Sequence, residues 1–277
     1  MWNNEGQGFN QSQSRRGSGL LSISMGLANL GRKVKRTCPD CGEEFEATNL
    51  GPATARYCRK CGEERERQQE ERERIAGEQL EESRYRELIA RARIPPKWKE
   101  VTFDNSNPEL NPRAFKLARS YAEKFNAQSP SLVFYSPGPG TGKTHLAVCI
   151  ANYVLHEKRL PVLFKKARDL MLDIRRTFSD RSDMTEADIL DRVLSVQLLV
   201  LDDVGVDPTS QWLQATYWTV FDRRLEWQLP VVVTTNKPLE APQGEECLGD
   251  RIGNGAVSRL IDLCQGNVID MLGPDLR

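Results

Sequence analysis

The sequence predicts an α/β fold in which helices flank a parallel sheet, preceded by a small four-cysteine zinc-ribbon domain and a charged helical linker. Three observations predict this arrangement. A glycine-rich loop ending in Lys-Thr follows an apolar run in residues 133–144. Helical and apolar segments then alternate, as they do where helices cover both faces of a parallel sheet. Two cysteine pairs and a long charged stretch lie in the first third of the chain.

The glycine-rich loop is close to a phosphate-binding loop and makes nucleotide binding the first functional hypothesis. Its glycines permit the tight turn that points successive N–H groups at phosphate oxygens. Lys143 can reach the β- and γ-phosphates, and the Thr144 hydroxyl can coordinate Mg²⁺. We expect ATP contacts from Gly138, Pro139, Gly140, Thr141, Gly142, Lys143 and Thr144. The strict pattern has glycine where this chain has Pro137, so the match is near-complete.

An apolar run at residues 198–201 is followed by Asp202 and Asp203. Such a run suits a strand buried on both faces, and its C-terminal end is where open α/β sheets bind ligands. Asp202 is expected to hold Mg²⁺, directly or through water, and Asp203 to orient or deprotonate the attacking water. The alternative is that the pair caps a turn. Its position about 60 residues after the loop favours the magnesium role.

Polar residues also follow the apolar run at residues 231–233. Among them, Asn236 could position the attacking water beside the γ-phosphate, although asparagine is equally ordinary at a strand end. Further on, Arg251 and Arg259 carry guanidinium groups that are well shaped for phosphate. In a single chain they could also be surface residues.

Several of these segments together resemble the ATPase domain of DnaC/DnaI-type helicase loaders and their IstB-like relatives. The motifs that carry the resemblance lie at residues 93–98, 102–105, 140–147, 199–205, 234–236 and 273–277. They cover roughly residues 93–277, and the ordered set is more specific than any single motif. The resemblance implies an AAA+ ATPase that binds single-stranded DNA and a replicative helicase.

The resemblance also implies roles for the polar residues. By motif position, Asn236 would be sensor 1 and Arg259 the arginine finger for ATP on a neighbouring subunit, and Arg251 matches a second family arginine. The catalytic set is then Lys143, Asp203, Asn236 and Arg259. Arginine fingers are worth about 10³–10⁵ in rate in GTPases, so a solitary subunit is expected to hydrolyse ATP weakly until assembly stimulates it. Pro137 and an apparent insertion at residues 253–255 depart from the family pattern.

Two Cys-x-x-Cys pairs, Cys38 with Cys41 and Cys58 with Cys61, are separated by 16 residues. Four thiolates at this spacing predict a tetrahedral structural zinc site. Bound metal could supply about 10–16 kcal/mol of stability that so short a segment lacks. Disulfides are the competing interpretation and are disfavoured in an intracellular ATPase. Gly42 and Gly62, which follow the second cysteine of each pair, are expected to adopt positive φ.

Composition divides the chain into four parts. We expect a disordered segment at residues 1–36, a zinc-binding domain at 37–62, a charged helical linker at 63–93 and an ATPase domain at 94–277. Glu/Arg pairs spaced i,i+4 favour the helical linker, and no persistent heptad seam supports a coiled coil. No apolar run approaches the ~20 residues of a membrane span.

The 39 basic and 39 acidic residues give no net charge, so DNA binding would depend on local basic runs at residues 32–36 and 165–168. The leading hypothesis is a cytoplasmic helicase loader that uses Mg²⁺ and ATP. It would form homo-oligomers on single-stranded DNA and deliver a replicative hexameric helicase bound through the zinc domain. One alternative is a transposase-assisting ATPase of the IstB type. The other is a non-hydrolysing zinc adaptor with a degenerate ATP site, which only Pro137 supports.

Overall fold

The computed structural model describes residues 30–178, 185–241, 244–271 and 273. The chain divides into two compact units, Met1–Leu80 and Glu81–Arg277, and the long helix α2 (Arg59–Ala92) belongs partly to each. Each unit is described by itself. Among the described helices, none combines the length and the apolar character needed to cross a membrane.

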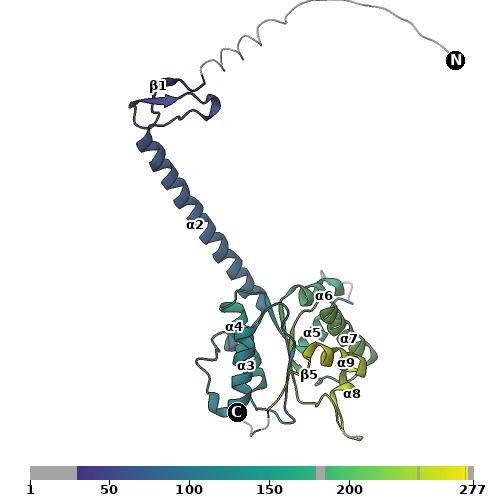
Figure 1. Cartoon of the computed structure of the whole chain (residues 1–277). Helices are drawn as coiled ribbons and strands as arrows, with labels where there is room; N and C mark the ends of the chain where they lie inside the picture. The colour runs from purple at the N-terminus through teal and green to yellow at the C-terminus, as the bar shows by residue number, and fades with distance from the viewer. Residues whose placement is uncertain (1–29, 179–184, 242–243, 272, 274–277) are drawn as a thin grey trace, which may run out of the picture. The chain divides into compact units, whose positions relative to one another are not determined.

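The first unit contains a two-stranded antiparallel sheet (Figure 1). Strand β1 (Lys33–Thr37) pairs with β2 (Glu44–Thr48), and the short helix η1 (Gly51–Ala53) follows before α2 begins at Arg59. Strand β1 therefore begins inside the segment that was expected to be disordered to residue 36. The backbone of this polar stretch is ordered because all five of its residues pair with β2.

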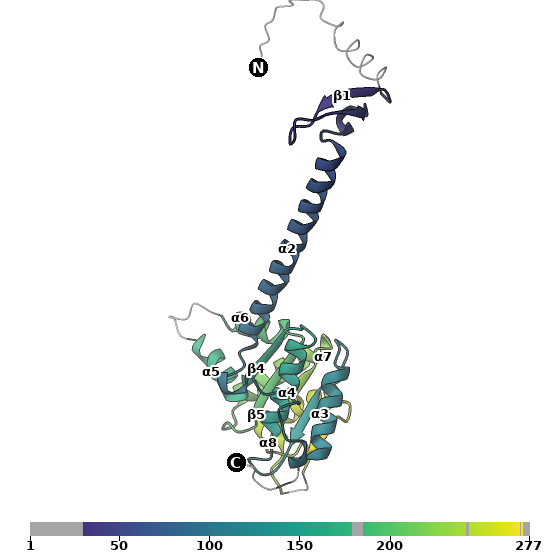
Figure 2. The same ribbon diagram turned by 90° about the vertical axis from the view of Figure 1, so that its left-hand side faces the viewer.

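The second unit is built on a five-stranded parallel sheet with strand order β4-β5-β6-β3-β7. The strands are β3 (Leu132–Tyr135), β4 (Val162–Lys166), β5 (Leu198–Val204), β6 (Val231–Thr235) and β7 (Val268–Asp270). Figure 2 shows the neighbouring strands β4 and β5 side by side. This sheet confirms the predicted α/β class with a parallel sheet flanked by helices.

Helices cover both faces of the sheet. They are α3 (Pro112–Lys124), α4 (Lys143–His156), α5 (Ala167–Arg176), α6 (Glu186–Ser195), α7 (Gln211–Glu226), α8 (Leu248–Ile252) and α9 (Asn254–Cys264), with short helices η2 (Pro96–Trp98) and η3 (Pro108–Leu110). Figure 1 shows α3 and α4 on one side of β5, and α7, α8 and α9 on the other.

Two apolar clusters form the core, one on each face of the sheet. Alternate residues of β3 belong to different clusters, because side chains along a strand point to opposite faces: Val133 packs on the α5–α9 side, and Leu132 and Phe134 pack on the α3–α4 side. In α3, Ala114, Ala118 and Ala122 are fully buried at four-residue spacing, which lets this helix approach α4 closely. The continuous apolar runs in the sequence are thus strands buried on both faces.

Candidate nucleotide and zinc sites

The phosphate-binding loop connects β3 to α4 and keeps its turn despite Pro137. Gly140 and Gly142 have φ of 73° and 90°, in the left-handed region where glycine carries no steric cost. Helix α4 begins at Lys143, so the positive end of its dipole faces the loop. The Lys143 ammonium donates to the carbonyl oxygen of Gly138 at 2.9 Å. The Lys143 side chain therefore folds back over the loop, where an incoming phosphate can reach its ammonium group.

Asp202 is the centre of a buried hydrogen-bond network. Its Oδ1 accepts hydrogen bonds from the hydroxyls of Thr144 (2.7 Å) and Thr234 (2.8 Å), and only 1% of the residue is exposed. Burial raises the pKa of this carboxyl, and the neighbouring charge of Asp203 adds to the rise, while the hydroxyl donors oppose it. An ionised carboxylate kept in such a place is suited to an incoming cation.

A bulge in β5 brings Asp203 to the same cavity as Asp202. The pairing of β5 with β6 shifts register between Leu201 and Val204, and Asp203 has a left-handed φ of 58°. The Thr234 hydroxyl accepts a hydrogen bond from the Asp203 N–H at 2.8 Å and fixes this conformation. Consecutive residues of a regular strand face opposite sides, so the bulge is what allows both carboxyl groups to line one cavity.

The cavity beside the loop has a volume of about 700 Å³. Its polar lining comes from loop residues Pro139 to Thr144, together with Lys166, Asp202, Asp203 and Asn236. The buried Oδ1 of Asn236 has no hydrogen-bond partner among the described residues. Gly138 does not line the cavity, and its carbonyl is instead an acceptor for Lys143. The other loop and strand-end residues selected from the sequence all line the cavity, and they come from the C-terminal ends of β3, β5 and β6.

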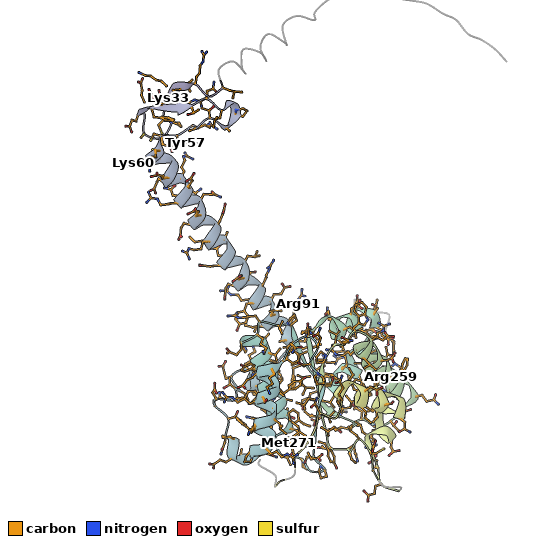
Figure 3. All side chains as sticks on the ribbon, in the orientation of Figure 1. Lys33, Tyr57, Lys60, Arg91, Arg259 and Met271 are labelled. Atoms are coloured by element: carbon orange, nitrogen blue, oxygen red, sulfur yellow. The ribbon has the colours of Figure 1, made fainter. Side chains whose placement is uncertain are left out.

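The rest of the cavity lining includes apolar and amide-bearing residues that sequence reasoning did not select as site residues. They include Trp98, Leu110, Phe115, Leu146 and Met271, with Asn105 and Asn111. Figure 3 labels Met271, which follows β7, and its side chain lies 3.7 Å from the position of a Cβ at Gly142. The sequence signal for Trp98 was its place in the motif at residues 93–98, one of the motifs that carry the family resemblance.

The two arginines selected from the sequence do not line this cavity. Arg259, labelled in Figure 3, projects from α9 and pairs with Asp222 of α7 at 2.6 Å between Nε and Oδ1. Arg251 at the end of α8 pairs with Glu246 at 3.0 Å. Gly253 lies between α8 and α9 with a φ of 89°. The subunit's own cavity is therefore lined by three lysines, Lys97, Lys143 and Lys166, and by no arginine.

The four cysteines of the first unit form one cluster. The sulfurs of Cys38, Cys41, Cys58 and Cys61 all lie within 4.8 Å of one another, and the Cys41 and Cys58 sulfurs are 3.7 Å apart. A tetrahedron with Zn–S bonds of about 2.3 Å has sulfurs about 3.8 Å apart, so the donor set fits zinc. All four cysteines are free, which leaves no disulfide among them.

Backbone N–H groups around the cluster favour the thiolate form of Cys38. Burial alone would raise the pKa of the Cys38 thiol, but N–H groups of Cys58, Cys41 and Asp40 act on its sulfur and lower the pKa to about 6. Gly42 has a φ of 74°, as expected, and donates its N–H to the Cys38 carbonyl at 2.8 Å. The same expectation for Gly62 is wrong, because Gly62 lies within α2, where φ is negative.

Comparisons with known proteins agree with this geometry. A family model for IstB-like ATP-binding proteins matches residues 68–273. The replicative helicase loader DnaC of Buchnera aphidicola subsp. Acyrthosiphon pisum is 33% identical over 168 residues, 60% of this chain and 66% of the relative. The DnaC of Escherichia coli K12 is 32% identical over 164 residues, 58% of this chain and 65% of the relative. The chain therefore matches just under two thirds of the length of these relatives.

Solved structures show the same fold. A crystal structure of the DnaC helicase loader superposes with a TM-score of 0.55 at 24% identity, covering 64% of this chain and all of the other. AMPPCP-bound DnaA from Aquifex aeolicus superposes with a TM-score of 0.51 at 22% identity, covering 66% and 53%. These likenesses support the AAA+ fold. With three quarters of its residues matched by the family model, the chain belongs to the IstB-like family of ATP-binding proteins.

Proposed function

We propose that this protein is an ATP-dependent helicase loader that assembles on single-stranded DNA and delivers a replicative hexameric helicase. The observation that carries the proposal is the bulge that places Asp202 and Asp203 beside an intact phosphate loop, in a domain whose sequence matches DnaC. A domain that only bound a partner would have no need of two buried or strained carboxylates at this position.

ATP would lie in the cavity with its phosphates against the glycine-rich loop. Lys143 would leave the Gly138 carbonyl for the β- and γ-phosphates, and backbone N–H groups from Gly140 onward would surround them, since Pro139 has no N–H. Thr144 and Asp202 would hold Mg²⁺, which would neutralise phosphate charge. The base would pack against apolar lining residues such as Trp98, Phe115 and Met271.

Hydrolysis would use the two polar groups that remain beside the phosphates. Asp203 would orient or deprotonate the attacking water, because its left-handed backbone turns the carboxylate into the cavity. The unpartnered Asn236 oxygen would accept a hydrogen bond from the same water. Arg259 of a neighbouring subunit would stabilise the charge that develops on the γ-phosphate. Because each subunit holds its own Arg259 on Asp222, a solitary subunit would turn over slowly.

Single-stranded DNA would bind along α5 and the start of α7. Phe178 is exposed, and its ring centroid lies 6.0 Å from that of Trp212 in an edge-on arrangement. The Arg175 guanidinium lies 4.9 Å from the centre of the Trp212 ring, and Lys166 and Arg168 are exposed nearby along the chain. Aromatic faces beside cationic groups suit stacking of bases with weak sequence preference. The zinc unit would engage the helicase.

A loading assay tests the proposal. The protein, a replicative helicase from the same cell and circular single-stranded DNA are mixed with ATP, and helicase retained on the DNA is measured after a salt wash. Retention is expected to require the protein and to be lost with Lys143→Ala. A pull-down that recovers a transposase and no helicase would instead assign the IstB-type role. Measurable ATP hydrolysis would eliminate the adaptor alternative.

A further inference from the structure

We propose that a basic groove beside β4 binds an extended acidic and apolar segment of a protein partner. The groove has a volume of about 840 Å³ and lies between β4, α5, α6 and the C-terminal end of α2, within the second unit. It shares no lining residue with the nucleotide cavity. It also differs from the aromatic surface of Phe178 and Trp212, neither of which lines it.

Cations dominate the rim of the groove. They are Arg91, Arg93, Lys165, Arg176 and Arg192, against the single carboxylate of Asp173. Asp173 pairs with Lys165 and with Arg176, and Arg91 pairs with Glu87 one turn earlier in α2. Arg93 is exposed and forms no ion pair with any described residue, and the exposed Arg192 interacts at longer range with Asp188, one turn earlier in α6. The groove therefore has an excess of positive charge that its own side chains do not neutralise, which favours an acidic occupant.

The floor of the groove is apolar, which favours a protein segment over a nucleic acid as the occupant. Leu163, Ile189 and Val196 line it with 7–8% of their surfaces exposed, and all three belong to the core cluster on this face of the sheet. No aromatic side chain is among the lining residues, so bases would find nothing to stack on. Apolar side chains of a peptide, in contrast, would cover this floor while acidic side chains meet the arginines at the rim.

The backbone at Arg93 supports a binding role for its side chain. Arg93 directly follows the last residue of α2 and has a left-handed φ of 51°. Glycine is the usual residue at this position after a helix, because it has no Cβ and adopts this conformation without steric strain. Arg93 nevertheless adopts this conformation, which places a guanidinium without a carboxylate partner at the rim of the groove. Strained positions of this kind are concentrated at binding sites.

The position of β4 accounts for the extended form of the occupant. Strand β4 is at the edge of the five-stranded sheet, and Leu163 and Lys165, two residues apart, both face the groove. An extended segment places alternate side chains on opposite sides, and such segments commonly bind beside the open edge of a sheet. A segment that alternates acidic and apolar residues therefore matches a groove with a cationic rim and an apolar floor.

Fluorescence anisotropy with synthetic peptides tests the inference on the full-length protein. Three labelled peptides of about ten residues are compared: alternating Glu and Leu, alternating Lys and Leu, and alternating Glu and Ser. The Glu–Leu peptide is expected to bind most tightly, because it alone satisfies both rim and floor. Arg93→Ala with Arg192→Ala is expected to weaken its binding about threefold to thirtyfold, as for exposed charge pairs. Arg84→Ala with Arg223→Ala removes the same charge elsewhere and is expected to change nothing.

A charge reversal separates recognition from misfolding. Arg93→Glu with Arg192→Glu is expected to lose the Glu–Leu peptide and to gain the Lys–Leu peptide, which a misfolded protein would not do. Equal binding of the Glu–Leu peptide by wild type and by the double alanine variant would overturn the proposal. So would a loss of oligo(dT) binding in that variant with peptide binding unchanged, because the groove would then belong to nucleic acid.

Discussion

Asp202→Asn is expected to stabilise the nucleotide-free protein and to reduce the stabilisation that Mg²⁺ and ATP provide. Burial raises the pKa of the Asp202 carboxyl above its unfolded value. Its contribution to stability is therefore present below the ordinary aspartate pKa of about 3.9 and is lost as pH rises through the raised folded value. At neutral pH the ionised carboxylate is a cost, which asparagine removes while its Oδ1 can still accept from Thr144 and Thr234.

The size of the lost Mg²⁺ effect follows from the Thr144–Asp202 contact. Removing a group that orients a metal ligand typically weakens metal binding 10–100-fold, which is about 1.4–2.8 kcal/mol. For a domain of this size each kcal/mol shifts Tm by roughly 2–4 °C, so the shift induced by Mg²⁺ and ATP should shrink by roughly 3–10 °C.

Thermal unfolding in EDTA and in saturating Mg²⁺-ATP measures both effects on the same sample. Asp169→Asn, which alters an exposed aspartate of α5 outside the cavity, is the matched control and is expected to match wild type in both buffers. The two effects of Asp202→Asn have opposite signs, so a general loss of structure cannot produce them. A lower Tm in EDTA, or an undiminished shift with Mg²⁺-ATP, would refute the assignment of Asp202.

Two further predictions concern structural groups. Elemental analysis is expected to find one equivalent of zinc in the wild-type protein and none in Cys58→Ser. Cys247→Ser, which lies outside the cluster, should retain the zinc. Equal zinc in both variants would exclude this cluster as the site. Arg224 is fully buried and donates to the carbonyls of Val193, Val196, Leu229 and Pro230. Arg224→Met should lower the free energy of unfolding, measured in urea, by about 3 kcal/mol or more, because these carbonyl acceptors lose their donor. Arg223→Met, at an exposed position, should leave the free energy of unfolding unchanged. An equal loss in both variants would contradict this explanation.

The parallel sheet and the phosphate end of the site could be predicted because each depends on local pattern. Apolar runs mark buried strands, and Thr144, Asp202 and Asn236 follow such strands or the glycine loop directly. The bulge could not be predicted, because Asp203 takes its left-handed conformation from pairing with β6 and from the Thr234 hydroxyl. The apolar residues of the cavity were not predicted for a similar reason. Residues between Trp98 and Phe115 reach the loop through tertiary contacts with α4: Trp98 and Ser106 contact His145, and α3 packs on the same helix.

Mixing two inactive variants tests most directly whether hydrolysis occurs between subunits. Lys143→Ala should not bind ATP productively but still offers Arg259, and Arg259→Ala should bind ATP without a finger for its neighbour. Each alone is expected to be nearly inactive on single-stranded DNA, while an equal mixture should recover about one quarter of the wild-type rate, because random assembly pairs one site in about four correctly. A mixture as inactive as its components, or full activity of Arg259→Ala alone, would contradict the account.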